Sequence, residues 1–341
     1  MSVRARWILI AVLAVLAFAA TGVVGIVAWQ QYQARQQAPS DVATEAAPVI
    51  GSDRVVFRST ASGAEYGHVA SVPLTDPSGP RAISDVVCDR VDATPLEFSC
   101  LRTVRGITPS YTGTLYRADG TEAASWPLPG LPSRTRISSD GTLIASTSFV
   151  TGHSYATIGF STDTRIHTTT GEDLGTLEDW SLMIDGRPSA PVDRNYWGIT
   201  FVDDDTFYAT VGMTTVGTTY LVKGSISTRS LDAIAANVEC PSLSPDGTRI
   251  AFKRVTSGSG PTVHWTPAVY DIATGAVTLL PETRSIDDQI EWLDDGTILY
   301  GMPRDGAVGD YDVWKLAADG SSEPSVFIEH AWSPSVVRGR G

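Results

Sequence analysis

A short motif recurs along most of this chain and constrains its fold more than any other feature. Residues 240–251, CPSLSPDGTRIA, combine a short apolar run, a Pro-Asp-Gly turn and a second apolar run. Related segments stand at 137–146, 199–209 and 290–301, with a degenerate copy at 86–100. Each predicts two short strands joined by a tight turn, because proline, aspartate and glycine favour the backbone angles of hairpin turns. The turns recur at intervals of about 40 to 65 residues, the range of a four-stranded propeller blade with variable loops.

The two ends of the repeat region predict how the array closes. Each motif is followed by a polar loop and a second hairpin, and there are six second hairpins but only five first hairpins. Residues 331–337, AWSPSVV, read as an innermost strand with no continuation, and residues 54–58, RVVFR, as a second strand with no predecessor. Joining them completes a sixth blade and removes exposed sheet edges. The sequence predicts an all-β, six-bladed β-propeller over residues 53–337, in which only residues 231–236 indicate a helical turn.

The residue pattern of the repeat is similar to that of a known class of propeller proteins. The segment PSLSPDGTRIAF, from Pro241 to Phe252, and the terminal AWSP, from Ala331 to Pro334, resemble the repeat of TolB-like, WD40-related propellers. This resemblance covers residues 53–337 and implies the propeller fold. It implies little about activity, because envelope translocation proteins and the propeller halves of prolyl oligopeptidases share the repeat. The chain departs from TolB itself in carrying an apolar helix where TolB has a separate N-terminal globular domain.

Residues 7–29, WILIAVLAVLAFAATGVVGIVAW, are the longest apolar run and contain one clearly polar side chain, Thr21. As a helix the run would be about 35 Å long, enough for the roughly 30 Å core of a bilayer. A cleaved secretory signal is the alternative, since residues 17–19, Ala-Phe-Ala, resemble a cleavage site. The apolar run continues for ten residues beyond Ala19, which favours an uncleaved transmembrane helix.

Charge predicts the orientation of the chain. Arg4 and Arg6 precede the apolar run, so the positive-inside rule places residues 1–6 in the cytoplasm and the propeller outside the cell membrane. Residues 30–52, rich in Gln, Ala and Pro, read as a flexible linker, and residues 338–341 as a tail. The net charge of -13 argues against binding nucleic acid. We therefore expect a single-pass membrane protein of the cell envelope with an extracytoplasmic propeller.

Three cysteines lie in the predicted propeller, where an extracytoplasmic setting permits oxidation. Cys88 and Cys100 flank the degenerate turn in strands expected to be neighbours, so either a cross-strand disulfide or two free thiols would fit. Cys240 is expected to be buried in an innermost strand, where it would pack as a small apolar side chain. The spacing of cysteines and histidines does not match a metal site, and neither a metal nor a cofactor is expected.

The recurrent turn is not expected to be catalytic. Ser244 and Asp246 stand together in the turn, but the related turns at 140–141 and 295–296 keep the Asp-Gly pair without a serine nucleophile or a histidine base. No catalytic residue is therefore predicted.

One face of the predicted ring holds the candidate binding residues. Loops from second to third strands and the connections between blades emerge together on this side, which we call the loop face. Aromatic, histidine and arginine residues recur in these loops, as they do in interfaces. They are Trp180, Arg187, Arg194, Tyr196 and Trp197 in the longest connection, 177–197, and His153, Tyr155, His264, Trp265 and Tyr311 in shorter loops. In the competing interpretation, the long loops have no binding role, and Trp180 and Trp197 pack at the ends of blades.

We expect the propeller to bind an envelope protein, peptide or glycan without catalysis. The alternative is a propeller enzyme, a hydrolase or lyase, with acids, bases or metal ligands converging at the mouth of the central channel. A sensor that signals through the helix is disfavoured because only six residues precede residue 7. An apolar, aromatic patch on the loop face would favour binding, whereas several carboxylates and histidines that point into one channel mouth with a bound cation would favour the enzyme.

Overall fold

The structure is a computed structural model of the chain, and it describes every residue except 1, 41, 107, 151–160 and 340–341. The chain divides into two units. One contains residues 1–42 and 61–66, and the other contains residues 43–60 and 67–341.

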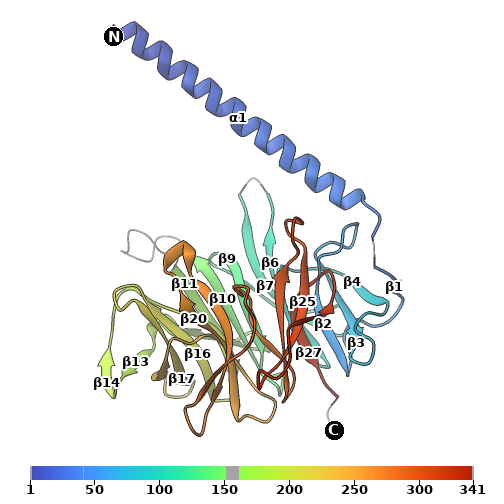
Figure 1. Ribbon diagram of the computed structural model, residues 1–341, viewed down its shortest axis with the longest axis vertical. Coiled ribbons are helices and arrows are strands. Elements are labelled where there is room, and N and C mark those ends of the chain that lie inside the picture. The colour runs from blue at the N-terminus through green and yellow to red at the C-terminus, as the bar shows by residue number, and fades with distance from the viewer. Residues whose placement is uncertain (1, 41, 107, 151–160, 340–341) are drawn as a thin grey trace. The chain divides into compact units, whose positions relative to one another are not determined.

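The first unit consists mainly of one long helix, α1 (Val3–Gln37), drawn in blue in Figure 1. Its residues Val3–Gln31 are long and apolar enough to cross a membrane, a property that N-terminal signal sequences share. The hydroxyl of Thr21 donates a hydrogen bond of 2.8 Å to the carbonyl oxygen of Ala17, so this polar group is satisfied within the helix. The apolar helix predicted over residues 7–29 is present, and it extends further in both directions.

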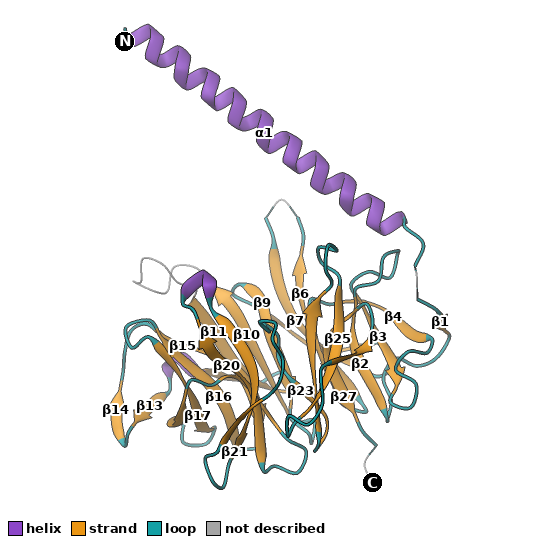
Figure 2. Ribbon diagram, in the orientation of Figure 1, coloured by secondary structure: helices purple, strands orange, loops and turns teal. Residues whose placement is uncertain are grey.

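The second unit contains six sheets, each forming one blade of a β-propeller (Figure 2). Blade 1 consists of β27 (Ala331–Val337), β2 (Arg54–Ser59), β3 (His68–Pro73), β4 (Arg81–Val87) and β1 (Thr44–Glu45). Blade 2 consists of β5 (Arg90–Ala93), β6 (Glu97–Val104), β7 (Ser110–Arg117) and β8 (Glu122–Pro127). Blade 3 consists of β9 (Leu131–Ile137), β10 (Leu143–Val150), β11 (Ser161–Thr168) and β12 (Asp173–Thr176).

The remaining blades follow in chain order. Blade 4 consists of β15 (Arg194–Phe201), β16 (Thr206–Met213), β17 (Thr218–Ser225), β18 (Ser230–Ala236), β13 (Ser181–Ile184) and β14 (Arg187–Ser189). Blade 5 consists of β19 (Glu239–Leu243), β20 (Arg249–Ser257), β21 (His264–Asp271) and β22 (Val277–Leu279). Blade 6 consists of β23 (Glu291–Asp294), β24 (Thr297–Pro303), β25 (Tyr311–Ala317) and β26 (Ser325–Ile328). Two single 3₁₀ turns, η1 (Leu177–Asp179) and η2 (Gly260–Thr262), lie in connections.

The innermost strands form a closed ring. The first strand named for each blade contacts the first strands of the two neighbouring blades, in the order β27, β5, β9, β15, β19 and β23 and back to β27. Blade 1 is completed by β27, which pairs antiparallel with β2 from Arg54 opposite Val337 to Ser59 opposite Ala331. In Figure 1 the red β27 accordingly lies beside the blue β2. Both the six blades and the closure by strands from the two ends of the repeat region are confirmed.

Apolar side chains fill the spaces between blades. Val55 and Phe57 of β2 pack with Leu299 of β24 and Val313 of β25, and all four are fully buried. Second strands are covered by a neighbouring blade on each face, and for this reason β2 and β24 contain consecutive buried residues and not strictly alternating ones.

The recurrent turns close the hairpins between first and second strands on the side opposite the loop face, which we call the turn face. The hydroxyl of Ser244 donates a 2.6 Å hydrogen bond to Asp246 and accepts one of 3.0 Å from the Arg249 N–H, while Gly247 adopts φ +70°. Hydrogen bonds to its carboxylate, first that from Ser244 and then those from the N–H and hydroxyl of Thr248, lower the pKa of Asp246 to about 2. The serine and aspartate of the motif therefore stabilise a turn.

Three segments differ from the expectation. Residues 44–50, expected in the linker, belong to the propeller unit: β1 pairs parallel with β4, and Val49 and Ile50 are buried among apolar side chains. Residues 231–236 lie in the strand β18 and not in a helical turn, because pairing with β17 overrides their helix-favouring composition. The long connection 177–197 contains η1, the hairpin β13–β14 and the beginning of β15.

A disulfide joins Cys88 and Cys100, whose Cα atoms are 5.4 Å apart. Cys100 lies in β6 opposite Val91, whereas Cys88 lies between β4 and β5 and outside both strands. The bond is therefore not between directly opposed strand residues, and it fastens the connection from blade 1 to the second strand of blade 2. Cys240 is buried in β19, at an unusual positive φ of 51°.

Removing residues 331–341 should open the ring, because β2 loses its pairing partner and buried Val55 and Phe57 lose their cover. We expect the cooperative thermal transition, followed by near-ultraviolet circular dichroism, to disappear. Removal of residues 340 and 341 alone is the control and should leave the transition in place. An unchanged transition in the longer truncation would show that closure by β27 is dispensable.

Replacing both Cys88 and Cys100 by alanine should lower the free energy of unfolding by roughly 2 to 3 kcal/mol, because the unfolded chain loses a covalent constraint on a short loop. Urea denaturation of oxidised wild type and of the double variant measures the difference. Replacing the free Cys240 by alanine controls for thiol removal, and this variant should remain sensitive to reductant. Equal stability of wild type and double variant would contradict the prediction.

Candidate functional site

Charged side chains meet near the axis of the ring, and the pairs of Arg90 and Arg136 join blades that are not neighbours. Near the loop face, Arg90 of blade 2 contacts Asp288, which precedes blade 6, at 2.9 Å, and its guanidinium lies 3.9 Å from the ring centre of Trp332. Lys253 contacts Asp287 at 2.7 Å. These pairs occupy the loop-face side of the axis, where the alternative prediction had expected catalytic groups.

A second group of charges lies nearer the turn face. Arg136 of blade 3 pairs with Glu291 of blade 6 on the opposite side of the ring and lies 3.5 Å from Asp92 of blade 2. Above this group a cavity of about 290 Å³ opens among the ends of the inner strands, and its lining includes Thr200 and Ser242. We call it the axial cavity.

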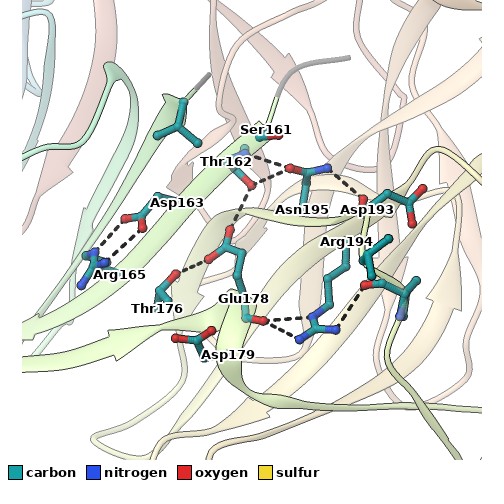
Figure 3. Close-up of a pocket in the computed structure, with 13 residues that line it drawn as sticks. Ser161, Thr162, Asp163, Arg165, Thr176, Glu178, Asp179, Asp193, Arg194 and Asn195 are labelled. Carbon is teal, nitrogen blue, oxygen red and sulfur yellow. Dashed lines mark hydrogen bonds and ion pairs between the residues drawn. The ribbon is translucent and has the colours of Figure 1, made fainter. Parts of the chain in front are cut away.

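The larger cavity, about 480 Å³, lies on the loop face between blades 3 and 4, and we call it the loop-face cavity. It is lined by the ends of β10 and β11, by η1 and by the segment that leads into β15. Figure 3 shows that most of its lining residues are polar. Thr162 and Thr176 approach the carboxylate of Glu178, and Arg194 approaches the main chain of the same residue.

Glu178 is the most perturbed acid of this cavity. It accepts hydrogen bonds from the Thr162 hydroxyl at 3.0 Å and the Thr164 N–H at 3.1 Å, and also from the Thr176 hydroxyl. Burial raises the pKa of Glu178 to about 7, and the hydrogen bonds from Thr176 and Thr164 oppose that rise. The carboxyl group therefore exchanges its proton near neutral pH.

The floor of the cavity is held by side-chain to main-chain hydrogen bonds. Asn195 accepts a 2.8 Å hydrogen bond from the Thr162 N–H, and Asp193 accepts one of 2.8 Å from the Thr215 N–H, which lowers the pKa of Asp193. Arg194 donates to the carbonyl oxygen of Glu178 at 2.6 Å. The groups are thus fixed in place by the protein, as suits a preorganised binding site.

Several exposed apolar side chains lie close to this cavity. Val192 lines it and is 79% exposed, and Val216, next to the Thr215 that binds Asp193, is 49% exposed. Leu131, at the start of β9, is 51% exposed and pairs with Phe149 beside the lining residue Val150. Exposed apolar side chains, one part of the apolar and aromatic patch expected of a binding surface, therefore lie on the loop face beside this cavity.

The residues of the connection 177–197 that were predicted to bind a ligand differ in their burial. Trp180 and Tyr196 are 4% and 0% exposed and belong to the core of blade 4, where Trp180 packs edge-on against Phe207. Trp197 is partly buried and lies over Gly212, at which a Cβ atom would clash with the indole. The competing interpretation, in which these tryptophans plug a blade, describes their positions better. Arg187 is exposed in β14.

Among these predicted residues, Arg194 lines the loop-face cavity. Others lie around the loop-face side of the axis: the Lys253 ammonium is 4.6 Å from the ring centre of Trp265, and Tyr311 stacks on Trp332 at 4.6 Å. His264 is partly buried at the start of β21. His153 and Tyr155 lie outside the described residues.

Sequence reasoning missed Glu178 and Asp193, as well as the axial pairs of Arg90 and Arg136. Glu178 and Asp193 stand in the connection that the sequence singled out, but the search there favoured aromatic residues and arginine. Arginines inside the innermost strands, such as Arg136 in β9, could have indicated these ion pairs, since a buried guanidinium requires a partner. Within the described part of the chain, no cluster of three or more His, Cys, Asp or Glu side chains could hold a metal ion.

No protein-family model matches the chain, and a search of the curated proteins gives no significant match. Solved structures do match. TolB from Acinetobacter baumannii superposes with a TM-score of 0.56 at 16% identity, covering 84% of this chain and 67% of that one. A puromycin-hydrolysing peptidase from Mycobacterium tuberculosis gives 0.48 at 14%, covering 87% and 48%. An oligogalacturonate lyase in complex with manganese gives 0.49 at 9%, covering 78% and 73%.

The sheet order and ring closure define the class of protein as a six-bladed β-propeller. Within that class its fold is similar to that of TolB, as the repeat had indicated. At this level of identity the similarity describes the fold, and the ligand has to be argued from the site.

Stability should depend on pH through Glu178. Its pKa in the folded protein, about 7, exceeds the roughly 4.3 of an unfolded glutamate, so folding favours the protonated form. This contribution is complete below about pH 4.3 and is lost as pH rises through about 7. Glu178→Gln should therefore lose less stability than wild type between pH 5 and 8 in urea denaturation. Glu323→Gln, at an exposed position, is the control, and identical profiles for wild type and Glu178→Gln would contradict the assignment.

Proposed function

We propose that this chain is a membrane-anchored, extracytoplasmic binding module that recognises a polypeptide of the cell envelope through the loop-face cavity, without catalysis. The observation that carries the proposal is this cavity of about 480 Å³, which has polar walls and exposed apolar side chains at its edge. Such a combination is typical of recognition sites, where polar groups fix orientation and apolar groups supply contact area.

The internal hydrogen bonds of the cavity support binding over catalysis. Glu178 is held by three donors, Asp193 by the Thr215 N–H, and Arg194 by main-chain carbonyl oxygens. A catalytic acid or nucleophile needs a free approach to the reacting atom and a base within hydrogen-bond reach. Among the residues that the structure describes, the cavity presents no serine or cysteine nucleophile bonded to a base.

Three features support an envelope location. The apolar helix α1 fits a membrane anchor, and the arginines at positions 4 and 6 precede its apolar core. The disulfide between Cys88 and Cys100 suits an oxidising compartment outside the cytoplasm. The similarity of fold to TolB agrees with this placement, although it does not name a partner.

Point substitutions at the cavity edge test the proposal better than a deletion, because removing residues 178–196 would also remove the buried Trp180 and Leu182. We expect Val192→Asp and Asp179→Arg to reduce by at least tenfold the recovery of a crosslinked partner from membranes, quantified by mass spectrometry, since both positions line the cavity and are exposed.

Leu96→Asp is the matched control, because Leu96 is 67% exposed in a hairpin turn of the turn face. This variant should recover the partner at the wild-type level, and thermal melting should show that all three variants fold. If the cavity variants and the control recover the same proteins in equal amounts, the loop-face cavity is not the binding site.

A further inference from the structure

The axial cavity lies on the turn face, away from the loop-face cavity, and all six blades contribute to it. Its walls are the ends of the inner strands, and the lining residues that matter here are Asp92, Arg136, Ser139, Glu291, Ser335 and Arg338. Because every blade supplies one wall, the cavity exists only in the closed ring. Its volume of about 290 Å³ is at the lower end for ligand pockets, which suits a single side chain or a small molecule.

The floor of the cavity holds two carboxylates for one guanidinium. Arg136 pairs with Glu291 and lies 3.5 Å from Asp92. Asp92 is only 5% exposed, and its other oxygen accepts a 2.7 Å hydrogen bond from the Ile137 N–H. Glu291 also accepts a 3.2 Å hydrogen bond from the Val336 N–H. One guanidinium is thus shared by two carboxylates at the floor of the cavity, where electrostatic interactions are stronger than in bulk water.

The rim adds negative charge. The hairpin turns that follow the lining residues Ser139, Phe201 and Pro245 carry Asp140, Asp203 and Asp246. Hydrogen bonds from their own turns lower the pKa of each aspartate. These aspartates therefore stay ionised in mildly acidic solution and attract cations toward the axis. Arg338, which is exposed and lines the cavity, is the cationic residue of the rim that would compete with such a ligand.

We propose that the axial cavity is a second binding site, which takes one cationic side chain, lysine or arginine, from an extended segment of a partner protein. The ammonium or guanidinium group adds a second positive charge beside Arg136 and contacts Asp92 and Glu291, and its aliphatic stem runs up the cavity past Ser139 and Ser335. This site is independent of the proposed function, because it lies on the other face and uses none of the residues of the loop-face cavity.

Protonation of Asp92 links this binding to pH. Burial raises the pKa of Asp92 to about 6, Arg136 opposes the rise and Glu291 adds to it. The groups that face Asp92 are Arg136 and the Ile137 N–H from β9, Glu291 from β23 and Ser335 from β27. A bound cation favours the ionised carboxylate, so affinity should rise as pH increases through about 6, and binding near that pH should release a proton.

Agmatine, which carries a guanidinium and an ammonium at the two ends of a four-carbon stem, is a suitable probe, and butylurea is a comparison compound that lacks both charges. With the full chain in nanodiscs, isothermal titration calorimetry should detect agmatine and not butylurea. Asp92→Asn and Glu291→Gln should each weaken agmatine binding at least tenfold, whereas Arg338→Gln should strengthen it two- to threefold. Titrations at pH 6 in buffers of different ionisation enthalpy should reveal the released proton.

Two further variants keep the test decisive. Ser139→Trp fills the exposed opening without altering the floor, so it should abolish binding even if the buried carboxylate variants fold poorly. Asp319→Asn removes an acid of the same face from an outer hairpin and should leave binding unchanged, and Val192→Asp should do the same.

The proposal is overturned if agmatine does not bind wild type, or if Ser139→Trp and Asp319→Asn bind it equally well. Loss of partner capture by Val192→Asp with intact agmatine binding would support both sites separately. Intact agmatine binding without any effect of Val192→Asp on capture would remove only the loop-face proposal.

Discussion

The antiparallel pairing of β27 with β2 is the contact on which the rest of the propeller depends. It joins residues from the two ends of the repeat region, and it completes the sheet that packs against both blade 6 and blade 2. Without it, two sheets would present open edges, and the inner strands would no longer surround an axis. The ion pairs across the axis and the axial cavity follow from this closure, because they use residues from blades that are not neighbours. The loop-face cavity needs only the neighbouring blades 3 and 4.

Closure also explains why charged residues occur among the buried residues of the innermost strands. Arg136 lies among buried residues of β9, and its partner Glu291 is 155 positions away in the chain. A buried charge without a partner would be costly, so the closed ring stabilises these residues only when opposite blades are in place. The axis is consequently a polar centre inside six apolar interfaces, closed by ion pairs near the loop face and hollow near the turn face.

The candidate sites show the limits of residue type as a guide to function. Aromatic residues in the connection 177–197 were predicted to bind a ligand, yet Trp180 and Tyr196 pack in the core with residues of blades 3 and 4. Glu178 was not predicted as a site residue, although burial raises its pKa to about 7. In both cases burial decides the role, and burial depends on which strands pair outside the repeat, a property that local composition does not encode.

The sequence by itself determined the fold class, the number of blades, the positions of the turns and the closing strands. These follow from turn chemistry and apolar runs, which act over a few neighbouring residues and therefore can be read locally. Only the tertiary structure decided which charges meet at the axis, which aromatic residues are buried and where the two cavities open. Those depend on side chains separated by as many as 198 positions, as for Arg90 and Asp288, which come together only when the ring is closed.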